Sequence, residues 1–380
     1  MVEQPFQTPP ADQRRKTRVA VVFGGRSAEH AISCATAGSV LATLDRDRYD
    51  VVPVGIATDG RWVLAPDDPE RLAIRGGNLP SVDGSGQALV LPADPSIRGL
   101  VTVAPSEVPQ QLGTVDVVFP LLHGPFGEDG TIQGLLELAD IPYVGAGVFA
   151  SAASMDKHYM KVVLGGSGLP MAPYVAVRDR DWRCERARVL DEIKRLGWPV
   201  FVKPARAGSS VGISKADDEE TLVRAVETAR EHDPKVLVET AIRGREIECG
   251  VLEGEGDARP EVSQPAEIAV QEGHDFYDFE AKYLDEGTRL DVPAALPAEV
   301  TEEVRRMAGA AFEALSCEGL ARVDFFYTDD GRVLLNEINT MPGFTPASLF
   351  PRVWAESGLE YPQLCERLIR VALNRPVGLR

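Results

Sequence analysis

The chain has little positive charge. Only 40 Lys and Arg residues stand against 58 Asp and Glu residues among its 380 residues, so the formal charge is −18. It therefore lacks the basic excess that neutralises the phosphates of a nucleic acid, and we expect no nucleic-acid partner. A small anionic ligand is still allowed, since a few lysines can be gathered locally.

Cysteine and histidine patterns are also missing. The five cysteines are scattered without a CxxC pair and the five histidines are equally dispersed, which argues against zinc and favours reduced thiols in a cytosol. No apolar run approaches the roughly 20 residues of a membrane span, and the first residues lack the apolar segment of a signal peptide. We therefore expect no membrane partner, and a disordered tail over residues 1–16, which are rich in Pro and Gln.

Three regions with different sequence patterns follow one another along the chain. Short Val-rich strands alternate with helical patterns over residues 17–150, which predicts a doubly wound parallel sheet. A smaller α+β unit is expected over 151–240. The remainder, 241–380, carries several strands, a helix over 297–315 and a final pair of strands. The predicted fold class is thus α/β and α+β, in three domains.

Two oxygen-bearing side chains end the last apolar strand. Glu337 and Asn339 are two residues apart and so share one face of the strand. The Asp329–Gly331 stretch predicts a tight turn, which would bring Asp324 of the preceding strand opposite Glu337. Oxygen ligands of this kind suit Mg²⁺. The alternative is a salt bridge of the carboxylates with Arg322 or Arg332.

Lysines and small residues suggest a phosphate-binding loop. Lys203 ends an apolar strand and precedes a loop of Gly and Ser over 206–212, whose backbone could approach a phosphate closely. The stretch lacks the P-loop pattern, and a flexible hairpin is the plainer interpretation. Lys157 and Lys282 are either phosphate ligands or solvated surface charges.

Two strands of the first domain end in glycine-rich turns. Glu29 follows the first of them, near the start of a helix, and His123 lies in the second. This edge of a doubly wound sheet is the usual ligand-binding edge, but the dinucleotide pattern GxGxxG is absent. Glu29 could complement the helix dipole or receive a substrate ammonium.

Taken together, seven segments resemble the D-alanine–D-alanine ligases in order and rough spacing, from about residue 18 to residue 375. They are GGRSAEH, HGPFGEDGTIQG, SMDK, VKPARAGSSVGIS, FYDFEAKY, ARVDFF and NEINTMPGFTPASLFP. The resemblance implies a three-domain ATP-grasp fold with ATP held between the last two domains. It also implies ligation of two D-alanines through an acyl phosphate, for peptidoglycan precursors in a bacterial cytoplasm, by a homodimer.

The resemblance assigns cofactor-binding roles. Two Mg²⁺ (or Mn²⁺) ions would lie on Asp324, Glu337 and Asn339, and a monovalent cation is compatible with the family. The phosphates would meet Lys157, Lys203, Lys282, Ser209 and Ser210. The adenine would meet Glu239 and the backbone of Thr240, Ala241 and Ile242. Glu246 would meet the ribose; its alternative is a surface salt bridge with Arg243 or Arg245.

The resemblance also assigns the amino-acid sites. Glu29 would receive the first D-alanine's ammonium and His123 would lie near its carboxylate. Arg322 and the N–H of Gly343 would stabilise the oxyanion, and Ser348 and Leu349 would hold the second D-alanine's carboxylate. Ser209 and Tyr283 would join Glu29 in closing the site, and Tyr283 favours an amine over a hydroxyl acceptor.

Three alternatives stay open at this point. One is a related ligase that joins D-alanine to D-lactate or D-serine. Another is a non-catalytic nucleotide sensor that kept the fold, against which the complete set of acids and lysines argues. The third is a dinucleotide-dependent oxidoreductase, which the first sheet would suit but the missing GxGxxG does not.

Overall fold

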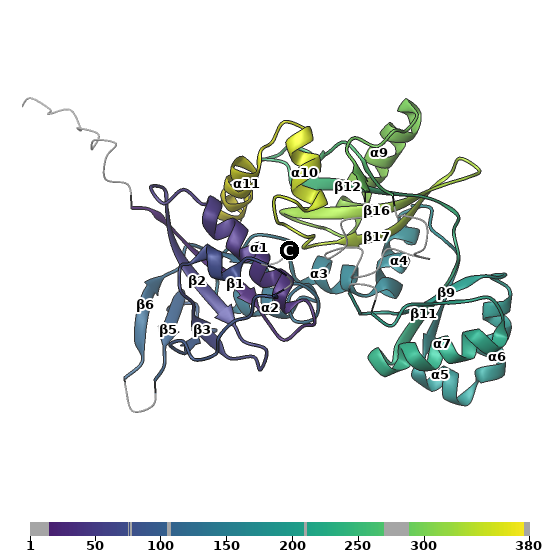
Figure 1. Cartoon of the computed structure of the whole chain (residues 1–380), viewed down its shortest axis with the longest axis horizontal. Helices are drawn as coiled ribbons and strands as arrows, with labels where there is room; N and C mark the ends of the chain where they lie inside the picture. The colour runs from purple at the N-terminus through teal and green to yellow at the C-terminus, as the bar shows by residue number, and fades with distance from the viewer. Residues whose placement is uncertain are drawn as a thin grey trace, which may run out of the picture.

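The structure is a computed structural model that describes residues 15–74, 76, 78–104, 108–208, 211–269 and 289–375. Figure 1 shows three groups of elements, which follow one another along the chain. The purple-to-blue group lies at the left, the teal group at the lower right, and the green-to-yellow group above and between them.

The first group is built on a four-stranded sheet in the order β3-β2-β1-β7, in which β2, β1 and β7 are parallel. Its strands are β1 (Thr17–Gly24), β2 (Tyr49–Ile56), β3 (Trp62–Leu64) and β7 (Val117–Pro120). Helix α1 (His30–Thr43) covers one face of this sheet, and α2 (Thr131–Leu138) covers the other. Strands covered on both faces must be apolar throughout, as the Val-rich β1 and β7 are. The predicted doubly wound parallel sheet is therefore confirmed.

A small antiparallel sheet in the order β4-β5-β6 flanks this sheet. Its strands are β4 (Leu89–Val90), β5 (Gly99–Thr102) and β6 (Gln110–Thr114), and a 3₁₀ turn, η2, spans Pro69–Leu72.

Two helices follow the first group, α3 (Val148–Met155) and α4 (Lys157–Gly166). They meet at Asp156, whose side chain accepts hydrogen bonds from the backbone N–H groups of His158 (3.1 Å) and Tyr159 (3.2 Å). An aspartate cap of this kind satisfies N–H groups that have no partner within the helix, so α4 begins where the side chain allows it.

The central group is an antiparallel sheet in the order β10-β9-β11-β8, covered by three helices. Helix α7 begins at a capping box formed by Asp218 and Thr221, and it packs Leu222, Val226 and other apolar side chains on the sheet. The elements are β8 (Tyr174–Arg178), α5 (Asp179–Cys184), α6 (Arg186–Lys194), β9 (Val200–Pro204), β10 (Ser214–Ala216), α7 (Glu219–His232) and β11 (Lys235–Thr240).

The last group is an antiparallel sheet in the order β15-β14-β12-β16-β17, with β13 paired to β12. Its strands are β12 (Gly244–Leu252), β13 (Glu261–Val262), β14 (Ala266–Ala269), β15 (Arg289–Asp291), β16 (Leu320–Thr328) and β17 (Val333–Asn339). The turn predicted around Gly331 joins β16 to β17, and this glycine has φ +83°. Helix α9 (Ala298–Ala314) covers one face with side chains spaced three or four residues apart.

Helices α10 (Leu349–Glu356) and α11 (Tyr361–Asn374) connect the last group to the first. One core contains side chains of β1, β7, α1, α10 and α11, and Figure 1 shows the yellow α11 beside the purple α1. In the part of the chain that the structure describes, no helix combines the length and the apolar character that crossing a membrane requires.

Candidate active site

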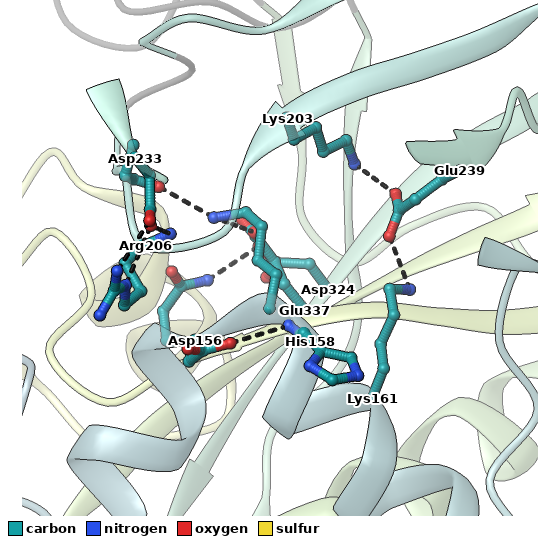
Figure 2. Close-up of polar contacts among 12 residues, drawn as sticks. Asp156, His158, Lys161, Lys203, Arg206, Asp233, Glu239, Asp324 and Glu337 are labelled. Carbon is teal, nitrogen blue, oxygen red and sulfur yellow. Dashed lines mark hydrogen bonds and ion pairs between the residues drawn. The ribbon is translucent and has the colours of Figure 1, made fainter. Parts of the chain in front are cut away.

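Three acids form a row across the C-terminal sheet. Glu248 on β12 lies opposite Asp324 on β16, and Asp324 lies opposite Glu337 on β17. The next row holds Arg322 opposite Asn339. Side chains of neighbouring strands at one register position share a face, so the predicted approach of Asp324 and Glu337 is present, as Figure 2 also shows.

Arg322 lies between two of these acids. Its Nε and terminal nitrogen donate to the two oxygens of Asp324 at 2.8 and 2.7 Å, and its Nε lies 2.9 Å from Glu248 Oε2. Burial alone would lower the pKa of Arg322, but the charges of Asp324 and Glu248 outweigh it and raise the pKa well above its usual value. The salt bridge predicted as the alternative to a metal is thus formed by Arg322, whereas Arg332 pairs with Asp330.

The donor atoms around Asp324 suit a hard cation that is bound together with a ligand. Asp324 and Glu337 supply carboxylate oxygens, and Asn339, whose Nδ2 donates to Asp324 at 3.1 Å, supplies an amide oxygen. Among the described residues no three His, Cys, Asp or Glu side chains are grouped to hold a metal by themselves. Mg²⁺ normally completes its coordination with water and phosphates, so this donor set fits a magnesium–nucleotide complex.

The first of three cavities lies between the central and C-terminal sheets. Residues from β9, β11, β12, β16 and β17 line it, and they include many of the predicted nucleotide ligands: Lys157, Lys203, Glu239, Thr240, Ile242, Glu246, Asp324 and Glu337. Phe201, Ile213, Phe325 and Phe326 give it apolar walls. A pocket with apolar walls and a few convergent charges is the usual form of a cofactor site.

The chain beyond Glu239 leads from the end of β11 along this cavity to β12. Thr240 and Ala241 donate their backbone N–H groups to the carbonyls of Pro173 and Pro199, both at 3.0 Å. Glu246 also faces the cavity. Arg245, one of its two predicted salt-bridge partners, pairs with Glu267 instead, through an Nε–Oε1 distance of 2.7 Å.

Glu239 is held between two lysines. Lys203 Nζ lies 2.7 Å from one carboxylate oxygen and Lys161 Nζ lies 2.9 Å from the other, as Figure 2 shows. Burial alone would raise the pKa of Glu239, but the charges and hydrogen bonds of the lysines outweigh it and lower the pKa to about 2. The three side chains therefore form an ionised cluster with a net positive charge beside the first cavity.

Lys157 links the start of α4 to the glycine-rich loop. Its backbone N–H donates to Ala205 O and its Nζ donates to Ala207 O, both at 2.9 Å, and its Nζ lies 3.9 Å from Glu337 Oε2. The base of the loop is fixed by Arg206, which donates three hydrogen bonds to Asp233 (Figure 2).

The second cavity adjoins the first, since Lys157, Ile213 and Glu337 line both. It is lined by Glu29, His123, Glu128, Gly208, Arg322, Asn339 and Gly343, among others. The glycine-rich loop approaches Glu29 so closely that a Cβ at Gly208 would lie 2.9 Å from Glu29 Oε2. A larger residue at position 208 would therefore push the Glu29 carboxylate aside.

Two titratable groups of the second cavity have shifted pKa values. His123 is buried, and burial lowers its pKa although the charge of Glu29 opposes this shift. Its Nδ1 lies 3.2 Å from Met341 O. Burial and the charge of Glu29 raise the pKa of Glu128 to about 8. Near neutral pH the cavity thus holds a neutral imidazole and a carboxyl group that retains much of its proton.

The third cavity lies on the other side of Arg322. Arg322 and Gly343 line both it and the second cavity, and Ser348 and Leu349 at the start of α10 line its far end. Ser348 Oγ accepts the backbone N–H of Thr345 at 3.1 Å, which fixes this turn. The three cavities therefore form a connected series: the second shares Lys157 and Glu337 with the first and shares Arg322 and Gly343 with the third. The first and the third also share Glu248.

Sequence reasoning missed three charged residues of this site, namely Lys161, Glu128 and Glu248. Lys161 follows Lys157 by four residues and so shares its helix face, and Glu248 follows Glu246 by two and so shares its strand face. Both spacings were visible in the sequence. Of the predicted residues, Ser209, Ser210, Lys282 and Tyr283 lie outside the described residues.

Comparisons with known families agree with this geometry. Residues 18–146 match the family described as D-ala D-ala ligase N-terminus, and residues 163–370 match D-ala D-ala ligase C-terminus. A D-alanine–D-alanine ligase of Streptomyces griseus is 58 % identical over 98 % of this chain and 96 % of its own length. Another from a Mycobacterium species is 57 % identical over 97 % of this chain and 99 % of its own length.

Solved structures with the same fold are also similar. The D-alanine–D-alanine ligase of Coxiella burnetii has a TM-score of 0.77 and 36 % identity, over 95 % of this chain and 94 % of that one. The D-Ala:D-Ser ligase VanG of Enterococcus faecalis has a TM-score of 0.81 and 34 % identity, over 94 % of this chain and all of that one.

Proposed function

The chain belongs to the D-alanine–D-alanine ligase family, and from this premise we propose how its three cavities join two D-alanines at the expense of ATP. The nucleotide occupies the first cavity, the first D-alanine the second and the second D-alanine the third. The observation that carries this proposal is the series itself, in which Lys157 and Glu337 border the first two cavities and Arg322 and Gly343 border the last two.

The nucleotide is held by charge and by apolar walls. Lys157 and Lys203 reach the phosphates as point charges, together with Lys282, Ser209 and Ser210. Glu239 with the backbone of Thr240, Ala241 and Ile242 meets the adenine, and Glu246 meets the ribose. Asp324, Glu337 and Asn339 would hold two Mg²⁺ or Mn²⁺ ions, which when bound neutralise charge on the transferring phosphoryl group.

The chemistry converts an unreactive carboxylate into an acyl donor. A carboxylate oxygen of the first D-alanine attacks the γ-phosphorus, the bond to ADP breaks, and an acyl phosphate forms. The amine of the second D-alanine then attacks the carbonyl carbon, and the proton that its nitrogen loses is taken up by the departing phosphate. The tetrahedral oxyanion is stabilised by Arg322 and the N–H of Gly343, and the C–O bond to phosphate breaks as phosphate leaves.

The amino acids are oriented from two sides. Glu29 receives the first ammonium, and its place against Gly208 ties this contact to closure of the glycine-rich loop over the site. His123 lies near the carboxylate of the first D-alanine. Ser348 and Leu349 hold the carboxylate of the second, at the start of α10. Closure with Ser209 and Tyr283 excludes water, which would hydrolyse the acyl phosphate.

The acceptor is D-alanine rather than D-serine or D-lactate. The relatives that share 54–58 % of this sequence are D-alanine–D-alanine ligases, whereas the D-Ala:D-Ser ligase is 34 % identical. We further propose that the protein acts as a homodimer in a bacterial cytoplasm. A monovalent cation is compatible with this function as an additional cofactor.

Mass spectrometry of the product tests the function directly. The protein would be incubated with ATP, Mg²⁺ and D-alanine, alone and with equal D-serine or D-lactate. We expect D-alanyl-D-alanine as the main product in every mixture, with one ADP formed per dipeptide. A main product that contains serine or lactate would overturn the acceptor assignment, and ATP hydrolysis without any ligated product would overturn the function.

A further inference from the structure

Glu248 is a buried carboxylate at the centre of the site, and the proposed mechanism gives it no role. It lies in the middle of β12, is 5 % exposed and lines both the first and the third cavities. Burying an ionised carboxylate is costly unless a charged partner compensates for it. Here that partner includes Arg322, whose Nε is 2.9 Å from Glu248 Oε2.

Two kinds of interaction use the same carboxylate oxygens of Asp324, namely hydrogen bonds and the proposed metal coordination. Both of its oxygens accept hydrogen bonds from Arg322, and Oδ2 also accepts one from Asn339. As a magnesium ligand, Asp324 would share these oxygens with the ion, whose positive charge weakens the attraction of the carboxylate for Arg322. Arg322, however, must stay at the junction of the second and third cavities if it is to stabilise the oxyanion.

We propose that Glu248 is a positioning residue that keeps Arg322 at this junction when Asp324 turns to the metal. Glu248 contacts the same guanidinium from the neighbouring strand and is not one of the proposed metal ligands. The inference rests on the proposed function, because it needs the metal and the two amino acids to occupy the places given above.

Removing the Glu248 charge has two consequences on this account. Of the two carboxylates within 3 Å of its guanidinium, Arg322 then keeps only that of Asp324, and it competes with the metal for that side chain. Arg322 also moves away from the oxyanion toward Asp324. A displacement of about 1 Å at a reacting centre can cost about 10²-fold in rate.

The test compares three single variants. Glu248→Gln keeps the size and removes the charge, whereas Glu248→Asp keeps the charge and shortens the reach. The matched control is Glu267→Gln, which removes the carboxylate partner of Arg245, 2.7 Å away, at a pair that lines none of the three cavities. Circular dichroism and thermal unfolding would show that each variant is folded.

Two readouts are measured for each variant. Electron paramagnetic resonance of Mn²⁺ in the presence of ADP reports metal binding without turnover. We expect Glu248→Gln to weaken Mn²⁺ binding about tenfold, which is the coupling expected between ionised side chains in contact. Steady-state kinetics at saturating Mg²⁺ should show kcat lower by about 10²-fold and a raised KM for the second D-alanine.

Each other outcome has a defined meaning. Wild-type Mn²⁺ affinity and kcat in Glu248→Gln would overturn the inference. Wild-type Mn²⁺ affinity and kcat in Glu248→Asp would show that only the charge of residue 248 matters, and this too would overturn a positioning role. Equal loss in Glu267→Gln would mean a general effect on the sheet, which contradicts the inference as well. A wild-type protein that binds Mn²⁺ and ADP but makes no dipeptide would instead count against the proposed function.

Discussion

At the scale of single residues, the cluster of Glu239, Lys161 and Lys203 shows how burial and function meet. Lys161 is 2 % and Glu239 is 4 % exposed, so neither charge is stable there without the other. The cluster also fixes Lys203 at the wall of the first cavity. We therefore expect its loss to affect both the stability of the fold and nucleotide binding.

The first prediction concerns Glu239→Gln. Breaking a buried ion pair by removing one partner costs about 3–5 kcal/mol, so the free energy of unfolding should fall by about that amount at neutral pH. The KM for ATP should rise, because Lys203 is no longer held. Urea unfolding measures the first effect and steady-state kinetics the second. Glu303→Gln, which removes an exposed i,i+3 partner of Arg306, should change neither.

The difference in unfolding free energy between the wild type and Glu239→Gln should depend on pH in a definite direction. The pKa of Glu239 in the folded protein is about 2, below its usual 4.5. As the pH falls, this carboxylate is therefore protonated in the unfolded chain before it is protonated in the folded protein. Its contribution to stability is fully present above about pH 4.5 and is lost as the pH falls toward 2. The gap in unfolding free energy between wild type and Glu239→Gln should therefore narrow between pH 5 and pH 3. A gap that stays constant would contradict the ionised cluster.

At the scale of elements, the first residue of α4 fixes the position of Lys157, the proposed phosphate ligand. Asp156 caps α4 and also pairs with Lys235 of β11, which ties the helix to the central sheet. Lys157 follows directly and bonds to Ala205 and Ala207 of the glycine-rich loop. The start of α4 thus sets the distance between Lys157 and the loop.

Two substitutions separate the cap from the charge pair. Asp156→Asn keeps an oxygen that can cap the helix but loses the charge facing Lys235. Asp156→Ala loses both, so it should be less stable than Asp156→Asn by about 1 kcal/mol, the usual worth of a cap. Its KM for ATP should also be the higher of the two. Equal stability of the two variants by urea unfolding would show that the cap contributes nothing.

Much of this element-level order was predictable from the sequence. The alternation of Val-rich strands and helices gave the parallel sheet, and Gly331 after two aspartates gave the turn between β16 and β17. The break between α3 and α4 lies at Asp156, where capping by the side chain decides it. The division of the chain near residues 150 and 240 stays a prediction.

The site was predictable only where sequence spacing carries the geometry. Asp324 and Glu337 could be paired because a hairpin fixes their register. Glu248 could not, because β12 is far from β16 in the sequence and nothing local specifies that they are neighbours. The approach of Gly208 to Glu29 was not predicted, since it joins segments that are far apart in the sequence.

At the scale of the whole molecule, the two ends of the described chain share one core. Side chains of α11, including Leu364 and Leu368, pack with Val19 and Phe23 of β1 and with Phe119 of β7. The C-terminal helix therefore completes the sheet whose carboxyl edge carries Glu29. The placement of the first and last groups, and so of the second cavity between them, depends on this packing.

Leu368→Ala tests this connection. Leu368 is 1 % exposed, and truncating a buried leucine costs about 2–5 kcal/mol. Hydrogen exchange should lose protection in β1 and α1 as well as in α11, because one core unfolds together. Leu373→Ala, on the same helix but 38 % exposed, should have little effect. Protection that falls in α11 alone would contradict a shared core.

The central claim is that the carboxylate of the D-alanine in the second cavity is phosphorylated by the nucleotide in the first cavity. The amine of the D-alanine in the third cavity then attacks the acyl phosphate. The most direct measurement uses D-alanine labelled with ¹⁸O in its carboxylate, together with ATP and Mg²⁺, and determines the label in the released phosphate by mass spectrometry. An acyl phosphate breaks at its C–O bond, so the account predicts one ¹⁸O atom in each phosphate formed with the dipeptide. Dipeptide formation with unlabelled phosphate would contradict it.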